Sequence, residues 1–261
     1  MTNYKVFPLP AFSDNYIWII QQADKIIVVD PGQAEPVLNL IQEQYLQLQA
    51  ILITHHHADH TGGLSALLQA FSVPVFGPRH EAIQGVDHLL EEGDRFELML
   101  GDLRISVLDV PAHTAGHIAY FAQPQGQDPW LFCGDTLFAS GCGRLFEGDS
   151  RQMLQSLEKF KNLPQNTKVF CAHEYTLSNI KWALAVEPHN AALQAWSTRA
   201  QALRDQGQAT IPTTIQHELQ CNPFMRTEQP AVIRSASDYA QQDLQEPVQV
   251  LATLREWKNN F

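Results

Sequence analysis

Cysteine is scarce in this chain, and its copies lie far apart. The 261 residues include four cysteines, at Cys133, Cys142, Cys171 and Cys221, and no two of them form a Cys-x-x-Cys pair. They are too few and too scattered for a disulfide scaffold in a chain of this size. We therefore expect reduced, buried thiols and a cytoplasmic protein.

Long apolar runs and an excess of basic residues are also missing. No run approaches the roughly 18 apolar residues of a membrane span, and the segment from Met1 to Pro8 lacks the apolar stretch of a secretory signal. Lys and Arg number 17 against 28 Asp and Glu, so the net charge is −11. Nucleic acid and an anionic membrane surface are therefore excluded as expected partners, because phosphate binding rests on clustered Lys and Arg. An anionic small molecule would need a few bases gathered locally.

The remaining composition is that of a folded α/β protein. Hydrophobic residues make up 44% and charged residues 17%, which is enough for a core. Up to about residue 173, short apolar runs alternate with turn signals and helical spacings. Strands are expected at 16–20, 25–29, 50–54, 73–76, 96–100, 103–110, 118–123, 130–133 and 168–171, with a hairpin turn at Gly101-Asp102. Helices are expected at 35–46, 64–71 and 150–161, the last with Ser150 as N-cap.

The pattern changes after residue 173. The segments 180–186, 190–206 and 248–258 have helical spacing, and no strand alternation is evident there. A mixed segment followed by a helical one predicts an α/β domain over residues 1–173 and a helical domain over residues 174–261.

Histidine is concentrated at one point. The chain has 11 histidines, and four of them lie between residues 55 and 60 in the string THHHADHTGG, where a buried strand gives way to a helix. Side chains alternate along extended backbone, so His55 and His57 can face one metal ion while His56 faces away. Asp59 and His60 fall where the chain turns into the helix, so they can face a second ion.

Three further candidate ligands follow other strands. His113, Asp135 and His173 each lie near the end of an expected strand, and strand ends of a layered sheet converge on one edge. His117 competes with His113. We prefer His113 because it follows Pro111 directly after the strand, and we expect His117 to support a ligand rather than bind metal. We interpret His80, His88, His189 and His217 as structural or exposed.

These motifs resemble those of a known family. THHHADHTGG is similar to the THxHxDH signature of the metallo-β-lactamase superfamily, and Asp30-Pro31-Gly32 precedes it in the order of that superfamily. Within it the chain resembles glyoxalase II, the hydroxyacylglutathione hydrolases, over nearly its whole length. The strings that carry this closer resemblance are CGDTLF from Cys133, GCGRLFEG from Gly141, AHEYT from Ala172 and NPFMR from Asn222.

The resemblance implies a metallo-β-lactamase-like αβ/βα four-layer sandwich with a helical C-terminal domain and two divalent metal ions, with zinc preferred and iron or manganese also compatible. It assigns His55, His57 and His113 to the first ion and Asp59, His60 and His173 to the second. Asp135 would bridge the two ions, and catalytic roles fall to Asp59 and Asp135. Ions that share a water molecule lower its pKa, so that it can attack a carbonyl carbon.

The implied reaction is hydrolysis of S-D-lactoylglutathione to D-lactate and glutathione, the second step of methylglyoxal detoxification. A thiolate leaves without a strong general acid, so no Ser or Cys nucleophile is assigned. Glutathione contacts in the family correspond to Arg144, Leu145, Phe146, His173, Tyr175, Arg255 and Lys258 in this chain. Position 144 is Arg where many relatives have Lys, and position 146 is Phe where some have Tyr. We expect a monomer.

Two other interpretations compete with this one. Another hydrolase of the same fold could act on a different thioester, a lactone, a lactam or a phosphodiester. The charge of −11 argues against a nuclease, and a lactamase would lack the helical tail. A binding module without metals would not need all seven candidate ligands.

Overall fold

The structure is a computed structural model that describes residues 4–98 and 103–261. It contains two compact units. The first consists of Met1–Asp109 and Thr114–Gly134, and the second of Val110–His113 and Asp135–Phe261. Residues 135–173 thus belong to the same compact unit as the helical segment, so the compact units do not follow the change of sequence pattern at residue 173. The division of function at that point stays a prediction.

The first unit contains a sheet of six strands in the order β1-β2-β3-β4-β5-β6. β1, β2 and β3 pair antiparallel, and β3 to β6 pair parallel. The strands are β1 (Lys5–Ala11), β2 (Asn15–Gln22), β3 (Lys25–Val29), β4 (Gln47–Leu52), β5 (Val75–Pro78) and β6 (His88–Leu90). The parallel pairs place the ends of β3 and β4 at one edge, where the histidine string begins.

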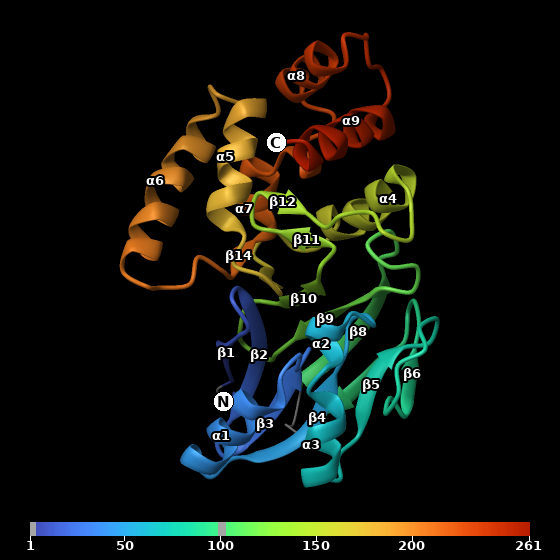
Figure 1. The fold of residues 1–261 in the computed structure, drawn as a ribbon, viewed down its shortest axis with the longest axis vertical. Coiled ribbons are helices and arrows are strands. Elements are labelled where there is room, and N and C mark those ends of the chain that lie inside the picture. The colour runs from blue at the N-terminus through green and yellow to red at the C-terminus, as the bar shows by residue number, and fades with distance from the viewer. Residues whose placement is uncertain (1–3, 99–102) are drawn as a thin grey trace. The chain divides into compact units, whose positions relative to one another are not determined.

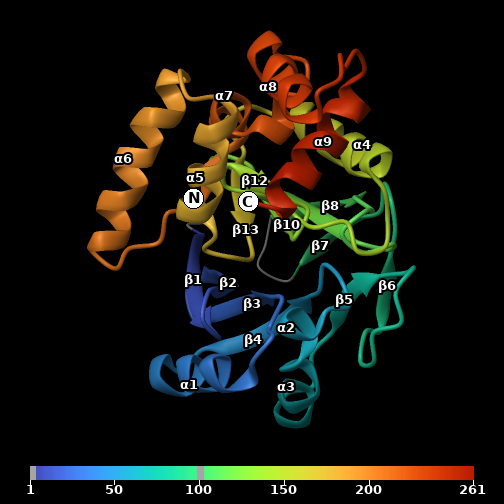
Figure 2. The ribbon, with the colours of Figure 1, turned by 45° about the horizontal axis from the view of Figure 1, so that its top comes forward.

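Three helices connect the parallel strands. They are α1 (Ala34–Gln44), α2 (Ala58–Thr61) and α3 (Leu64–Ala70). α1 and α3 lie along the same side of the sheet (Figure 1, Figure 2), and their buried side chains Val37 and Leu67 belong to one core cluster with Ile26, Val28 and Ile51. Burial of this apolar face anchors the loops at the strand ends.

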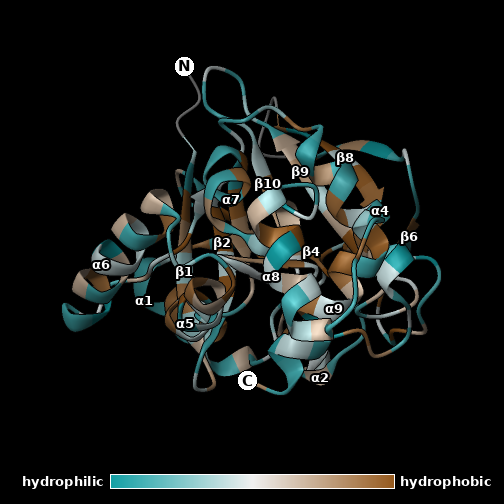
Figure 3. Ribbon diagram, turned by 90° about the horizontal axis from the view of Figure 1, so that it is seen from above, coloured by the Kyte–Doolittle hydropathy of each residue, from teal (hydrophilic) through white to brown (hydrophobic). Residues whose placement is uncertain are grey.

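A second, antiparallel set of strands completes the first unit. It consists of β7 (Arg95–Leu98), β8 (Leu103–Asp109), β9 (Ile118–Gln123) and β10 (Trp130–Gly134), in the order β10-β9-β8-β7. The pairing of β7 with β8 confirms the expected hairpin, whose turn lies outside the described residues. Tyr120 on β9 donates a hydrogen bond of 2.7 Å to the carbonyl of Ile53 beyond β4. Buried apolar side chains alternate with more exposed polar ones along β8, where Arg104 and Ser106 lie between Leu103, Ile105 and Val107. Figure 3, coloured by hydropathy, shows brown hydrophobic segments among the strands.

The second unit is mostly helical. Its elements are β11 (Leu137–Phe138), β12 (Gly141–Cys142), α4 (Ser150–Lys161), β13 (Lys168–Cys171), α5 (Thr176–Val186), α6 (Ala191–Asp205), β14 (Thr213–Thr214), α7 (Ile215–Cys221), a 3₁₀ turn (Pro223–Met225), α8 (Pro230–Ala240) and α9 (Pro247–Asn259). The helical pattern expected after residue 173 is confirmed, with one short strand added, because β14 pairs antiparallel with β13. A strand of two residues is too short to show an alternating pattern.

The N-cap of α4 is one residue earlier than expected. Asp149, not Ser150, accepts the hydrogen bond from the backbone N–H of Gln152, and the Gln152 side chain accepts in return from the Asp149 N–H. This reciprocal pair is a capping box, which a carboxylate forms as readily as a hydroxyl. Among the described residues, no helix is both long and apolar enough to cross a membrane.

Candidate metal centre and adjoining cavity

The first part of the histidine string runs in extended backbone beyond β4. His55 is buried, His57 is half-buried, and the Nε2 atom of His55 lies 3.1 Å from the Nδ1 atom of His57. Both rings therefore point the same way, as the alternation predicts. Ring nitrogens at this separation can converge on one ion.

The second part of the string forms the first turn of α2. His60 Nε2 lies 3.6 Å from Asp59 Oδ2, which also accepts a hydrogen bond of 3.0 Å from Asn15 Nδ2. The other ring nitrogen of His60 lies 3.0 Å from Asp30 Oδ2. Asp30 also accepts from the backbone N–H of Thr54, so one buried carboxylate holds two points of the string. An imidazole whose Nδ1–H is bound to a carboxylate presents Nε2 to a metal.

The sequence reasoning used Asp30-Pro31-Gly32 only as a strand end and a family motif. The structure shows what Asp30 and Gly32 do there. Asp30 has a φ of 52°, in the left-handed region that Asp tolerates better than most residues, and it turns its carboxylate toward His60. A Cβ atom on Gly32 would lie 1.8 Å from the carbonyl oxygen of Asp59, so only glycine fits beside the metal string. A carboxylate directly after a buried strand was the feature of the sequence that could have indicated this role of Asp30.

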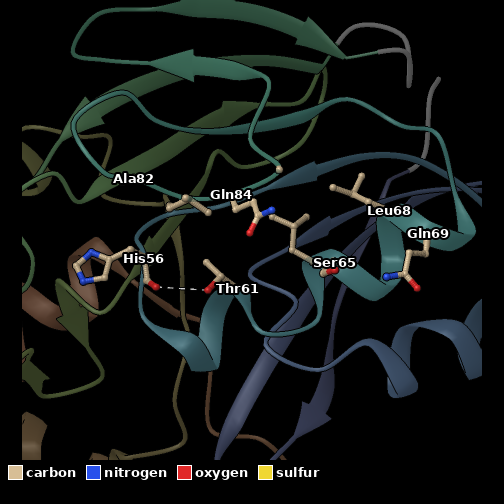
Figure 4. A pocket seen from close by; sticks show the side chains of 10 residues that line it. His56, Thr61, Ser65, Leu68, Gln69, Ala82 and Gln84 are labelled. Atoms are coloured by element: carbon tan, nitrogen blue, oxygen red, sulfur yellow. Dashed lines mark hydrogen bonds between the residues drawn. The ribbon is translucent and has the colours of Figure 1, made fainter.

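Two other histidines of this unit are arranged as expected. His56 points away from its neighbours, and its Nδ1 lies 3.1 Å from Glu81 Oε2. Its ring lies at one end of a separate cavity of about 470 Å³ beside α3 and residues 82–85 (Figure 4). His117 is fully buried and stacks on His55, with ring centroids 4.5 Å apart and an interplanar angle of 20°. Its ring packs against the face of the His55 ring and so supports it.

The second unit brings His113, Asp135 and His173 together. Asp135 follows β10, and its two carboxylate oxygens face different rings: Oδ2 lies 3.4 Å from His113 Nε2, and Oδ1 lies 3.4 Å from His173 Nε2. His113 Nδ1 donates a hydrogen bond of 2.9 Å to the carbonyl of Arg144. Because a carbonyl only accepts, the proton stays on Nδ1 and the Nε2 lone pair is available. Asp135 thus faces both His113 and His173, and it could contribute to holding metal ions beside either of them.

The side chains fit a metal centre built from nitrogen and oxygen ligands. Imidazoles and carboxylates suit zinc, iron or manganese, whereas structural zinc sites are usually closed with thiolates. The four cysteines are free and buried, which agrees with the expected reduced thiols. Burial raises the pKa of the Cys171 thiol far above its usual range.

A cavity of about 420 Å³ within the second unit begins at His113 and Asp135. Its other lining residues are Phe138, Cys142, Arg144, Phe146, Tyr175, Ser178, Asn179, Arg255 and Lys258. Five of the seven expected substrate contacts are in this set, whereas Leu145 and His173 are not. Tyr175 stacks on His173 with ring centroids 4.6 Å apart, which joins the cavity wall to a candidate ligand.

Sequence reasoning missed Phe138, Cys142, Ser178 and Asn179 as lining residues. Ser178 and Asn179 lie about one turn after Tyr175 on α5, so helical spacing was the available signal. Asn179 Nδ2 donates a hydrogen bond of 3.0 Å to the carbonyl of Ala139 and thereby holds the turn between β11 and β12. Phe138 ends the string CGDTLF that carries the family resemblance, and this string was its available signal.

The two bases on α9 have different surroundings. Arg255 is 5% exposed; its Nη1 donates to the carbonyl of Cys142 at 2.8 Å, and its Nε donates to Asn259 Oδ1 at 3.0 Å. Lys258 is half-buried, with its Nζ 5.1 Å from the centre of the Trp182 ring. Burial, followed by repulsion from Arg255, lowers the pKa of Lys258 to about 8. Lys258 is thus the more available cation.

Comparisons with known proteins match nearly the whole chain. The family model of the metallo-beta-lactamase superfamily matches residues 12–173, and the model described as hydroxyacylglutathione hydrolase C-terminus matches residues 174–261. A hydroxyacylglutathione hydrolase of Nitrosomonas europaea is 51% identical over 256 residues, covering 98% of this chain and 96% of the relative. One from Cupriavidus taiwanensis is 53% identical over 264 residues, covering 98% and 99%.

Solved structures agree with the fold. The BLEG-1 B3 metallo-beta-lactamase superposes with a TM-score of 0.63 at 25% identity, covering 85% of this chain and 99% of that one. TTHA1623, solved in a di-iron-bound form, gives 0.59 at 26% identity, covering 84% and 100%. These matches confirm the expected αβ/βα sandwich with a helical C-terminal region. The chain belongs to the hydroxyacylglutathione hydrolase family of the metallo-β-lactamase superfamily.

Proposed function

We propose that this chain is a metal-dependent thioester hydrolase that converts S-D-lactoylglutathione and water to D-lactate and glutathione. The observation that carries the proposal is the cavity of the second unit, which joins two candidate metal ligands, His113 and Asp135, to the cations Arg144, Arg255 and Lys258. Glutathione has two carboxylates, and a chain with a net charge of −11 needs such a local group of cations to hold it.

The proposed centre holds two divalent ions, with zinc as the preferred metal. His55, His57 and His113 would hold the first, Asp59, His60 and His173 the second, and Asp135 both. Support comes from the convergent rings of His55 and His57 and from the two oxygens of Asp135, each of which faces one imidazole. When bound, the ions supply an acidified water molecule and a Lewis acid for the thioester carbonyl.

The residues of the chain have separate roles in the proposed reaction. Asp135 and Asp59 neutralise and position charge at the centre, while the Arg144 backbone carbonyl keeps the proton of His113 on Nδ1. Lys258 and Arg144, which line the cavity, bind the carboxylates of the glutathione moiety. Cys142 also lines this cavity, but burial raises the pKa of its thiol, so Cys142 is not the nucleophile.

Residues 1–173 are proposed as the catalytic domain and residues 174–261 as the helical domain that binds glutathione. Tyr175 and Lys258 on the cavity wall support this division. The free, buried state of all four cysteines supports a cytoplasmic location. We propose that the protein acts as a monomer without nucleic-acid partners.

Metal analysis combined with a substrate panel tests the proposal. Purified protein should contain two equivalents of metal and hydrolyse S-D-lactoylglutathione much faster than a lactone, a β-lactam or a phosphodiester. Preference for one of the other substrates would assign the chain to another activity of the fold. Turnover without metal would exclude the proposed centre.

A further inference from the structure

Glu81 is a buried carboxylate that the sequence analysis did not single out and that the proposed reaction does not use. It follows β5, and its side chain is 3% exposed. A buried carboxylate is costly unless charges or hydrogen bonds compensate it. Glu81 has such partners: His56 Nδ1 lies 3.1 Å from Oε2, while the Thr114 hydroxyl and the Gly116 N–H, the latter at 3.2 Å, donate to Oε1.

These partners are sequence neighbours of three candidate ligands. His56 lies between His55 and His57, and side chains alternate along extended backbone. By holding His56 on one side of this extended segment, Glu81 fixes the backbone from which His55 and His57 point to the other side. Thr114 directly follows His113, so the same carboxylate also fixes the backbone immediately after the third ligand.

The approach of these segments is close enough to require glycine. A Cβ atom on Gly116 would lie 2.6 Å from Glu81 Cγ and 2.8 Å from the carbonyl carbon of His80. The backbone of the segment is thus in contact with the Glu81 side chain itself. Contacts this close leave little freedom for residues 114–116.

Asp30 is another buried carboxylate that contacts the histidine string. Asp30 Oδ2 lies 3.0 Å from His60 Nδ1, and it also accepts from the hydroxyl of Thr54, whose oxygen lies 3.0 Å from His55 Nδ1. His55, His57 and His113, whose neighbours Glu81 holds, are the three ligands proposed for the first ion. Asp30 is thus linked to ligands proposed for both ions, whereas the contacts of Glu81 lie beside the ligands proposed for the first ion.

We propose that Glu81 is a positioning residue for the first metal ion: it clamps the backbone beside His55, His57 and His113 and so sets the affinity of one ion of the pair. This inference rests on the proposed binuclear centre. It assigns no chemistry to Glu81, which acts only through the ligands.

The test is a Zn²⁺ titration of the metal-free protein in competition with a chromogenic chelator, which yields two dissociation constants. Glu81→Ala should raise one constant by roughly 10- to 100-fold, the usual effect of a group that orients a ligand, and leave the other unchanged. Glu81→Gln keeps an oxygen for Thr114 and Gly116 and should restore most of the affinity. Glu91→Ala is the matched control, because Glu91 is 47% exposed and pairs with Arg79 at 3.3 Å.

Unchanged constants in a folded Glu81→Ala variant would overturn the clamp, and so would an equal rise in both constants. If that variant does not fold, His56→Ala and Thr114→Val each remove one arm. Each should raise the same single constant, and no rise in either variant would also overturn the clamp. A wild-type chain that binds no zinc would overturn the proposed centre and the clamp together, whereas normal wild-type binding with an unaffected variant overturns the clamp alone.

Discussion

Individual side chains at the site are oriented by partners that decide which atom faces the proposed ions. His113 Nδ1 is held by the Arg144 carbonyl, His60 Nδ1 by Asp30, and His55 by stacking against His117. In the first two cases the Nε2 atom is the one left for a metal. Substitutions of a ligand and of its support should therefore differ in size.

Asp135→Ala should lower metal content and turnover together. Its two oxygens face His113 and His173, so its removal affects the ligands of both proposed ions. Metal analysis and steady-state kinetics measure the two effects, with Asp205→Ala, an exposed residue at the end of α6, as control. Full metal loading with near-normal turnover in Asp135→Ala would contradict the bridging role.

Substitution of His113 should lower kcat more than substitution of His117. His113→Ala removes a ligand and should lower kcat by several orders of magnitude. His117→Ala removes a stacking partner of His55 and should lower kcat by roughly 10- to 100-fold, as for other groups that orient ligands. Parallel kinetics on the two variants give the order, and the reverse order would show that His117 is the ligand.

Lys258 should make substrate binding depend on pH above 8. Its pKa is lowered to about 8, so the ammonium is present below that pH and is lost as the pH rises through it. A charge-assisted contact contributes about 1.5–3 kcal/mol, so KM should rise toward roughly 10-fold by pH 9.5 with little change in kcat.

Lys258→Arg is the matched variant, because its guanidinium stays charged over the whole range. Its KM should remain level where that of the wild type rises. Identical pH profiles for the two proteins would remove Lys258 from the carboxylate site.

At the scale of elements, α9 and the β11–β12 hairpin are joined through Arg255. The guanidinium donates to the Cys142 carbonyl and lies over the Phe224 ring, 5.3 Å from its centre. The sequence places Arg255 and Lys258 on one helical face, and on that basis both would bind glutathione. The structure gives Arg255 a second role, because its guanidinium donates a hydrogen bond to the backbone carbonyl of Cys142.

Arg255→Ala should therefore destabilise the fold as well as raise KM. A buried hydrogen bond from a charged group contributes about 1.5–3 kcal/mol, and the free energy of unfolding should fall by about that amount. Lys258→Ala should change stability far less. Denaturant unfolding of both variants makes the comparison, and equal stability of Arg255→Ala and wild type would leave Arg255 as a substrate contact only.

Secondary structure was predictable where the apolar pattern is local. The bounds expected for β3, β9, α4 and β13 are those observed, because alternation and helical spacing reflect one buried face. β1 escaped prediction because Pro8 and Pro10 interrupt its pattern. Proline is tolerated there because β1 lies at the edge of its sheet.

At the scale of the whole molecule, stability should depend on pH through Glu218. This carboxyl is fully buried and accepts hydrogen bonds from the Ser140 N–H, Asn222 Nδ2 and the Thr213 hydroxyl. Burial raises its pKa from 4.5 to about 7 in the folded chain. The folded state therefore binds more protons between those values, and the resulting stabilisation is present below 4.5 and lost as the pH rises through 7.

Glu218→Gln removes this titration. The difference in unfolding free energy between wild type and variant should fall by up to about 3 kcal/mol from pH 4.5 to pH 8. Denaturant unfolding at four pH values measures it. A constant difference would show that Glu218 has an ordinary pKa in the folded chain.

The sequence by itself determined the family, and it was enough to propose the ligands and their order along the chain. His55, His57, Asp59 and His60 lie within six residues, so alternation at the first two and the turn into a helix at the last two were enough to propose a division between two ions. The strings around Asp135 and Tyr175 then identified the subfamily. None of these inferences needed contacts between distant segments.

Only the tertiary structure decided which residues support the ligands and which cations are available. Glu81 lies 33 positions before Thr114, and Arg255 lies 113 positions after Cys142. A buried carboxylate or guanidinium has no periodic pattern, and its partners are chosen by the packing of distant segments. For the same reason, the sequence could not show that Arg255 is buried while Lys258 remains available to substrate.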